Sequence, residues 1–101
     1  MHTGDYAGAE PLFRRALATS ERVLGAEDPD TLTSVNNLAS VLEHTGDYAG
    51  AEPLYRRALL ARERVLGAEH PDTLQSVNNL AGLLHSTGTV APAPKLTLWA
   101  G

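Results

Sequence analysis

The stretch 45-TGDYAGAEPLYRRAL-59 decides the fold, because it repeats 3-TGDYAGAEPLFRRAL-17 with a single change. The similarity extends well beyond this stretch. Residues 3–44 align without a gap on residues 45–86, and 32 of the 42 aligned positions are identical. A fixed period of this size is typical of a solenoid or a repeat array. A duplicated compact domain is the alternative, but each unit is too small to bury its own apolar face, which favours stacking of the units.

Within each unit the apolar residues recur with the period of an α-helix. In the range 31–44, and again in 47–66, they lie three and four residues apart, which is the spacing of an amphipathic helix. Turn signals separate these ranges. Gly46 fits the end of one helix, Asp47 fits the N-cap of the next, and Gly67 fits the end of the long helix. We therefore expect an all-α chain without strands, with four antiparallel helices near residues 5–24, 29–44, 47–66 and 71–86.

Two residue types inside the long helices oppose this assignment. Pro53, like Pro11 in the first unit, has no backbone N–H to donate within a helix. Gly50, like Gly8, costs on the order of 1 kcal/mol relative to alanine. We therefore expect a frayed or bent first turn in the 47–66 helix, with regular helix beginning near Pro53.

Five motifs follow one another at a spacing that is characteristic of a known repeat. They are 36-NNLA-39, 46-GDY-48, 51-AEPLYRRAL-59, 65-VLG-67 and 70-HPDTL-74. Together they resemble the tetratricopeptide repeat, whose usual period is about 34 residues. The longer period here is similar to the 42-residue subtype of kinesin light chains and of many signalling proteins with nucleotide-binding domains. The resemblance implies a short α-solenoid of antiparallel helix pairs. The chain opens with the second helix of a repeat, so the helices follow the order B-A-B-A.

The chain divides into a repeat region and a tail. We expect the repeat region at residues 3–86, in the units 3–44 and 45–86. The segment 87–101 loses the pattern, although three of its apolar residues stay in phase with the preceding unit. Those residues are Ala91, Ala93 and Leu96. A degenerate third B helix and a disordered terminus both fit this segment, and its two prolines disfavour a regular helix.

A row of polar side chains follows each A helix on the side opposite its apolar stripe. The first row comprises Thr33, Asn36, Asn37, Ser40 and His44. The matching row comprises Gln75, Asn78, Asn79, Gly82 and Ser86. In a curved stack of helix pairs, the A helices line the concave surface. Amide side chains suit recognition of an extended peptide, because each one both donates and accepts hydrogen bonds.

The resemblance implies specific contacts on this surface. In similar proteins the second asparagine of the pair often touches bound peptide, which points to Asn37 and Asn79. An arginine on the long helix often joins it, which points to Arg62, whereas the aligned Ser20 departs from that pattern. The first asparagine of each pair faces outward and is an equal candidate, together with the neighbouring threonine, glutamine and serine. The alternative is that the amides hold neighbouring repeats together.

Other polar groups fit structural roles. The pairs Arg14–Arg15 and Arg56–Arg57 could bind acidic peptide side chains, but a solvated face paired with Glu10 and Glu52 four residues earlier is the simpler interpretation. His44 and His85 lie on successive A helices without a third ligand at helical spacing, so we expect no metal site.

Catalysis has no support in the sequence. Ser34 and Ser76 lack the flanking glycines of a nucleophile elbow, and no phosphate-binding GxxxxGK loop occurs. The carboxylates are scattered over helix starts and faces. We expect neither enzyme activity nor a cofactor.

The composition excludes several further classes. The chain has 8 basic and 12 acidic residues, a net charge of −4, so it lacks the electrostatic footprint of a nucleic-acid binder. It has no cysteine, which excludes disulfides, zinc–thiolate sites and thiol catalysis. No apolar run approaches the roughly 20 residues that span a bilayer, and the first residues do not resemble a signal peptide. We expect a cytoplasmic protein.

The sequence thus predicts a protein–protein interaction module that binds a peptide or a partner helix in its concave face. The main alternative is a structural or self-assembling fragment of a longer repeat array with no ligand of its own, and an inert remnant of a longer gene is a third. An uncapped solenoid exposes apolar stripes on its end helices, which self-association would cover. We expect those stripes at Tyr6, Leu12, Phe13 and Leu17 and at Leu80, Leu83 and Leu84.

Overall fold

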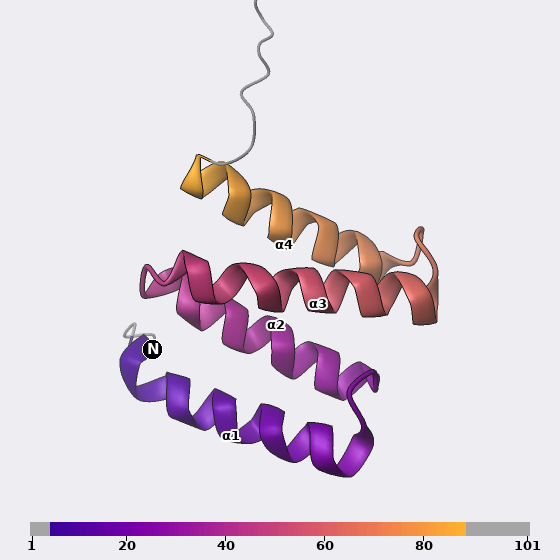
Figure 1. Cartoon of the computed structure of the whole chain (residues 1–101), viewed down its shortest axis with the longest axis horizontal. Coiled ribbons are helices and arrows are strands. Elements are labelled where there is room, and N and C mark those ends of the chain that lie inside the picture. Colours follow the sequence, from indigo (N-terminus) through magenta and orange to yellow (C-terminus); the bar gives the residue numbers. More distant parts are fainter. Residues whose placement is uncertain (1–4, 89–101) are drawn as a thin grey trace, which may run out of the picture.

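Four α-helices make up residues 5–88, the part of the chain that the structure, a computed structural model, describes. They are α1 (Tyr6–Leu24), α2 (Pro29–His44), α3 (Tyr48–Leu66) and α4 (Pro71–Thr87). Figure 1 shows them in chain order, each running opposite to the one before it. Residues 5–88 contain no strand, and each helix ends within one residue of its expected position. The prediction of a short all-α solenoid of antiparallel helices is confirmed, while nearly all of the predicted tail lies outside the described residues.

Regular helix begins before the prolines in both long helices. Helix α3 starts at Tyr48, before Pro53, so the expectation that regular helix begins near this proline is wrong. The cause is the N-cap: the Asp47 carboxylate accepts a hydrogen bond from the backbone N–H of Gly50 at 2.9 Å. Such a cap contributes about 1 kcal/mol, which offsets the helix-breaking tendency of the first turns. Asp5 caps α1 in the same way.

The turns between the helices follow the sequence signals. Gly46 and Gly67 have φ angles of +92° and +96°, a backbone conformation that only glycine adopts without strain. Gly67 follows the last residue of α3, and its N–H donates to the Glu63 carbonyl at 3.0 Å. Both glycines lie where the sequence predicted the helix ends.

Helix α2 lies between α1 and α3, and two of its sides are buried. Its buried residues are Thr31, Leu32, Val35, Leu38, Ala39, Val41 and Leu42. Helix α4 packs against α3 and buries one side, through Thr73, Ser76, Leu80 and Leu83. These four align with residues 31, 34, 38 and 41 of the first unit. An A helix therefore carries two apolar stripes, one toward the preceding helix and one toward the following helix.

The apolar stripes expected at the two ends are partly wrong. Leu80 and Leu83 are buried, because they belong to the stripe of α4 that faces α3. Leu17 is buried in the same core. Tyr6 and Leu12 on α1 are exposed as expected.

On the other side of α4, the residues left exposed differ from those expected. They are Leu74 and Val77, on the stripe that would face a following helix. Leu84, on the same stripe, and Phe13 of α1 are half-buried against the core.

Candidate functional site

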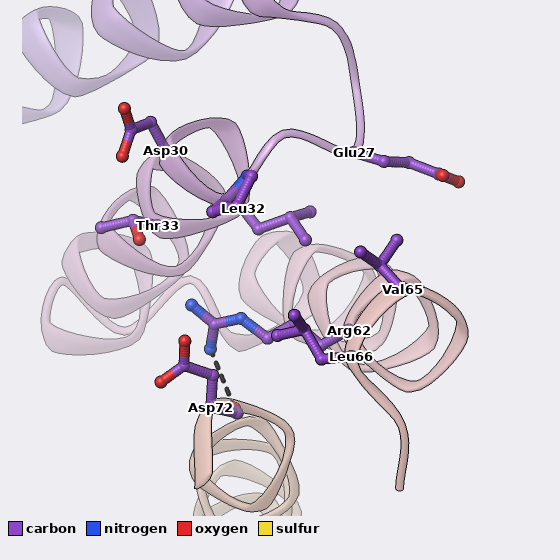
Figure 2. Close-up of a pocket in the computed structure, with 9 residues that line it drawn as sticks. Glu27, Asp30, Leu32, Thr33, Arg62, Val65, Leu66 and Asp72 are labelled. Carbon is purple, nitrogen blue, oxygen red and sulfur yellow. Dashed lines mark hydrogen bonds between the residues drawn. The ribbon is translucent and has the colours of Figure 1, made fainter. Parts of the chain in front are cut away.

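Arg62 is the centre of the candidate surface, and its side chain is 5% exposed. Arg62 lies on α3, and its Nη1 donates hydrogen bonds to three groups of α4. These are the Asp72 carbonyl at 3.1 Å, Ser76 Oγ at 3.0 Å and Gln75 Oε1 at 3.4 Å. Figure 2 shows the guanidinium between Thr33 of α2 and Asp72 of α4. Nη1 carries two hydrogens, so these acceptors share them. The side chain thus ties α3 to the start of α4.

Asn36 connects the same guanidinium to α2. With its amide oxygen turned toward Arg62, Asn36 accepts hydrogen bonds from Nη1 at 2.8 Å and from Nη2 at 3.3 Å. Asn36 is therefore half-buried and held, whereas the sequence placed it facing outward. Its counterpart Asn78 is exposed, and no arginine within residues 5–88 bonds to it. A single buried cation joins three helices through neutral acceptors.

The other candidates flank this junction. Thr33 and Asn37 on α2 and Gln75 on α4 are exposed, while Ser40 and Asn79 are half-buried. Thr33 and Gln75 lie on either side of Arg62, the first in the pocket that Arg62 lines and the second bonded to it. No hydrogen bond joins Asn37 to Asn79 within the described residues. Within residues 5–88 the side chains of these two asparagines form no hydrogen bond, so their donors and acceptors are available to a ligand.

A pocket of about 250 Å³ opens beside the Arg62 guanidinium. Its polar walls include the carboxylates Glu27, Asp30 and Asp72, drawn with Arg62 in Figure 2. In the described part of the chain, Arg62 forms no ion pair with any of them. Carboxylates accept hydrogen bonds and a guanidinium donates them, so the lining of the pocket includes both kinds of partner that a peptide backbone needs.

Tyr55 and Glu43 form a second polar contact below this surface, between α3 and α2. The Tyr55 hydroxyl donates to Glu43 Oε1 at 3.0 Å. Burial, helped by this hydrogen bond and by the Glu43 charge, raises the pKa of Tyr55 to about 12, while a hydrogen bond with Ser40 acts in the opposite direction. The aligned residue of the first unit is Phe13, which cannot make this bond.

The raised pKa of Tyr55 predicts a loss of stability at alkaline pH. Between pH 10 and 12 the unfolded chain releases the phenol proton and the folded chain keeps it, so the contribution is complete below pH 10 and is lost as the pH rises toward 12. We expect the free energy of unfolding to fall by on the order of 2 kcal/mol over this window. Urea denaturation followed by circular dichroism at several pH values measures it.

Tyr55→Phe is the control for this prediction, because it places the Phe13 side chain at the aligned position. The variant should be less stable at neutral pH by about 1–2 kcal/mol, owing to the lost bond to a carboxylate. Its stability should then decline less between pH 10 and 12. Identical declines in both proteins would contradict the assignment to Tyr55.

The surface arginines behave in two ways. Arg14 and Arg56 pair with Glu10 and Glu52 on their own helices, at 2.8 and 2.9 Å, as the sequence predicted. These exposed pairs contribute a few tenths of a kcal/mol each. Arg14 and Arg56 therefore belong to a solvated face.

Two further arginines make contacts that the sequence did not reveal. Arg57 of α3 pairs with Glu21 of α1 at 2.5 Å, and Arg64 pairs with Glu27 in the turn after α1. Both pairs connect one unit to the previous one. The repeat alignment shows which residues of the two units correspond, but it does not show which charged side chains turn toward the neighbouring unit.

The histidines serve the helix ends. The His44 ring stacks on Tyr6 with centroids 4.7 Å apart, and its Nδ1 lies 2.7 Å from the Ser40 carbonyl. His70 caps α4 by accepting the N–H of Asp72. Among the residues described, no group of three or more histidine, aspartate or glutamate side chains could hold a metal ion. None of the four helices is long and apolar enough to cross a membrane.

Comparison with known proteins identifies the repeat. No curated protein matches the chain. A family model described as tetratricopeptide repeat matches residues 1–30 and 31–72. The second match spans most of α2 and all of α3, an A helix followed by a B helix, and the two matches together cover well over half of the chain. With its stacked antiparallel helices and its 42-residue period, the chain belongs to the tetratricopeptide repeat family.

Proposed function

We propose that this chain is a protein–protein interaction module that binds an extended peptide or a partner helix on the surface formed by α2 and α4. Tetratricopeptide repeats generally mediate protein–protein interactions and are non-enzymatic. The observation that carries the proposal is the Arg62 junction. It fixes the two A helices at either side of a buried guanidinium and leaves amide side chains free beside it.

Each candidate residue has a role in this proposal. The exposed Thr33, Asn37, Gln75 and Asn78 meet the ligand directly. The half-buried Ser40, Asn36 and Asn79 and the buried Arg62 form the base of the surface. A rigid base lowers the entropic cost of binding, although so short a surface supports modest affinity. Asn36 and Arg62 contribute chiefly by positioning, because they already bond to each other.

The double substitution Asn37→Ala with Asn79→Ala tests this surface. The probe is a peptide selected on the chain from a display library of random sequences. Loss of two amide contacts should weaken its binding about tenfold to a hundredfold in isothermal titration calorimetry. Helicity should not change, since neither side chain bonds to the rest of residues 5–88.

Arg14→Ala is the matched control, because it removes an exposed polar side chain on α1, away from the surface. It should leave the affinity unchanged. Loss of helicity in the asparagine variant would show that the amides are structural. Unchanged affinity with full helicity would place the ligand elsewhere.

Two finer assignments belong to the same proposal. The 42-residue period and the NNLA and HPDTL motifs support the kinesin-light-chain-like subtype within the family. The absence of cysteine from the sequence supports a cytoplasmic location, where disulfides are rare.

A further inference from the structure

Within residues 5–88 one side of α4 is uncovered, and the first unit shows what such a side packs against. Leu74 and Val77 are 49% and 40% exposed, whereas the aligned Leu32 and Val35 of α2 are 2% and 0% exposed. The residues are the same in both helices. The difference is that α3 follows and covers α2. We call this side of α4, made by Leu74, Val77, Ala81 and Leu84, the tail face.

Helix α1 carries the side that would fit the tail face. Leu12 is 66% exposed and Ala16 is exposed, whereas the aligned Leu54 is half-buried and Ala58 is fully buried. These α3 residues belong to the core that α3 forms with α2. Helix α1 repeats these residues, and no helix within residues 5–88 covers them. We call this side of α1, made by Ala9, Leu12, Phe13 and Ala16, the head face.

Charged residues at the two ends also match. Within the chain, Arg57 and Arg64 pair with Glu21 and Glu27 of the preceding unit. The aligned arginines of the first unit are Arg15 and Arg22, and the aligned glutamates of the second unit are Glu63 and Glu69. All four are exposed, and none forms an ion pair within residues 5–88. If a second copy is placed on the first by the rotation and translation that relates the two units, Arg15 and Arg22 of the second copy lie opposite Glu63 and Glu69 of the first.

We propose that copies of this chain associate head to tail, with the head face of one copy on the tail face of the next. The contact repeats the packing of α3 on α2, together with the two ion pairs that α3 forms with Glu21 of α1 and with Glu27 in the turn after α1. Because the two faces differ, the contact is heterologous and leaves a free face at each end, so assembly continues beyond the dimer. This inference stands apart from the proposed function, since it does not use the surface around Arg62.

The contact between two copies should be weaker than the contact within the chain that it repeats. Phe13 takes the place of Tyr55, so the bond to a glutamate is missing, and Ser20 takes the place of Arg62, so the guanidinium is missing. The apolar residues of both faces and the two ion pairs remain. Association should therefore depend on concentration over the micromolar range.

Residues 89–101 are the other occupant that the chain itself could offer. Pro92 aligns with Gly50, whose N–H bonds to the Asp47 cap of α3. A proline has no N–H for such a cap. Helix α1 has a glycine at this position, and its own cap is formed. The second copy therefore fits the tail face better than this segment does.

Sedimentation velocity over a concentration series tests the proposal on the full chain. The weight-average mass should rise with concentration from 10.7 kDa to values above the dimer. Leu12→Glu blocks the head face and Val77→Glu blocks the tail face, and both side chains are exposed enough to be changed without disturbing the core. Each variant should remain at the monomer mass. An equimolar mixture of the two variants should form a dimer and no larger species. The intact tail face of the Leu12→Glu variant binds the intact head face of the Val77→Glu variant, and the other two faces are blocked.

The ion pairs give a second test that leaves the apolar faces intact. Arg15→Glu should weaken association several-fold, and adding Glu63→Arg in the same chain should restore it. Arg14→Glu is the control: the Arg14 and Arg56 side chains are 54% and 52% exposed, so a preceding helix does not cover this position. It should assemble like the original chain.

Several results would overturn the proposal. A monomer at every concentration would do so, as would assembly that survives both Leu12→Glu and Val77→Glu, or a mixture that forms no dimer. Leu96→Glu addresses the alternative occupant. If the original chain is monomeric and this change makes it assemble, residues 89–101 cover the tail face.

Discussion

Leu32→Ala is expected to lower the free energy of unfolding by about 3 kcal/mol, and Leu74→Ala by about 1 kcal/mol. The two leucines occupy aligned positions in nearly identical helices. Leu32 is covered by the following helix and Leu74 is half-exposed. Removing Leu32 leaves a cavity in the core, whereas removing Leu74 mostly removes surface that water already reaches. Position in the stack, and not local sequence, sets the cost.

Urea denaturation of the two variants at low micromolar concentration provides the comparison. Dilution matters, because association on the tail face would bury Leu74 and raise the cost of its removal. Equal losses in dilute solution would contradict the arrangement in which α3 covers Leu32 of α2 and nothing within residues 5–88 covers the tail face of α4. A cost for Leu74→Ala that grows with protein concentration would agree with head-to-tail assembly.

Arg62→Met should lower the free energy of unfolding by about 2–3 kcal/mol. Methionine replaces the aliphatic part of the side chain but removes every donor. Ser76 Oγ, which is fully buried, then loses its partner on α3, and Asn36 loses the group that holds its amide. Lysine at the same position should recover little, because one ammonium cannot span from α2 to α4 as a planar guanidinium does.

A double substitution separates this network from simple packing. If the loss comes from the unpartnered hydroxyl, Arg62→Met with Ser76→Ala should be more stable than Arg62→Met alone by about 1 kcal/mol. Ser20→Ala is the control at the aligned position of the first unit, where no such network exists, and it should change stability little. A loss below about 0.5 kcal/mol for Arg62→Met would contradict the structural role of the junction.

The helices and turns could be predicted because their signals are local. Gly46, Gly67 and Asp47 mark helix ends through the backbone conformation and hydrogen bonds of a few adjacent residues. The local exception is the first turn of α3, where the Asp47 cap offsets the effect of Pro53 and Gly50. The Asp47 carboxylate binds the N–H of the very glycine that was expected to weaken the turn.

The wrong end stripe has a different cause. An A helix is apolar on two sides, and the sequence of one unit does not say which side meets the preceding helix. A helical wheel does not distinguish the side of α4 that carries Leu80 and Leu83 from the side that carries Leu74 and Val77, because both sides are apolar. Their difference arises from packing between units, which becomes visible when the aligned positions of α2 and α4 are compared.

The sequence predicted the residues of the candidate surface, but it did not predict the hydrogen bonds of Arg62 at its centre. The polar rows on the A helices followed from spacing, but the partner of Arg62 did not. A long side chain on a B helix can turn to solvent or pass between two A helices, and the choice depends on the acceptors it finds there. The exchange of Ser20 for Arg62 between otherwise similar helices was the available signal.

The stacking of each helix on its neighbours in the chain also governs how the molecule folds. Helices that pack together are separated by short turns, so no long loop has to close before the first contacts form. Such local topology favours fast folding. It also means that folding can start at the α2–α3 hairpin, whose two helices each have a neighbour on both sides, and spread outward. Helices α1 and α4 would then join last and open first.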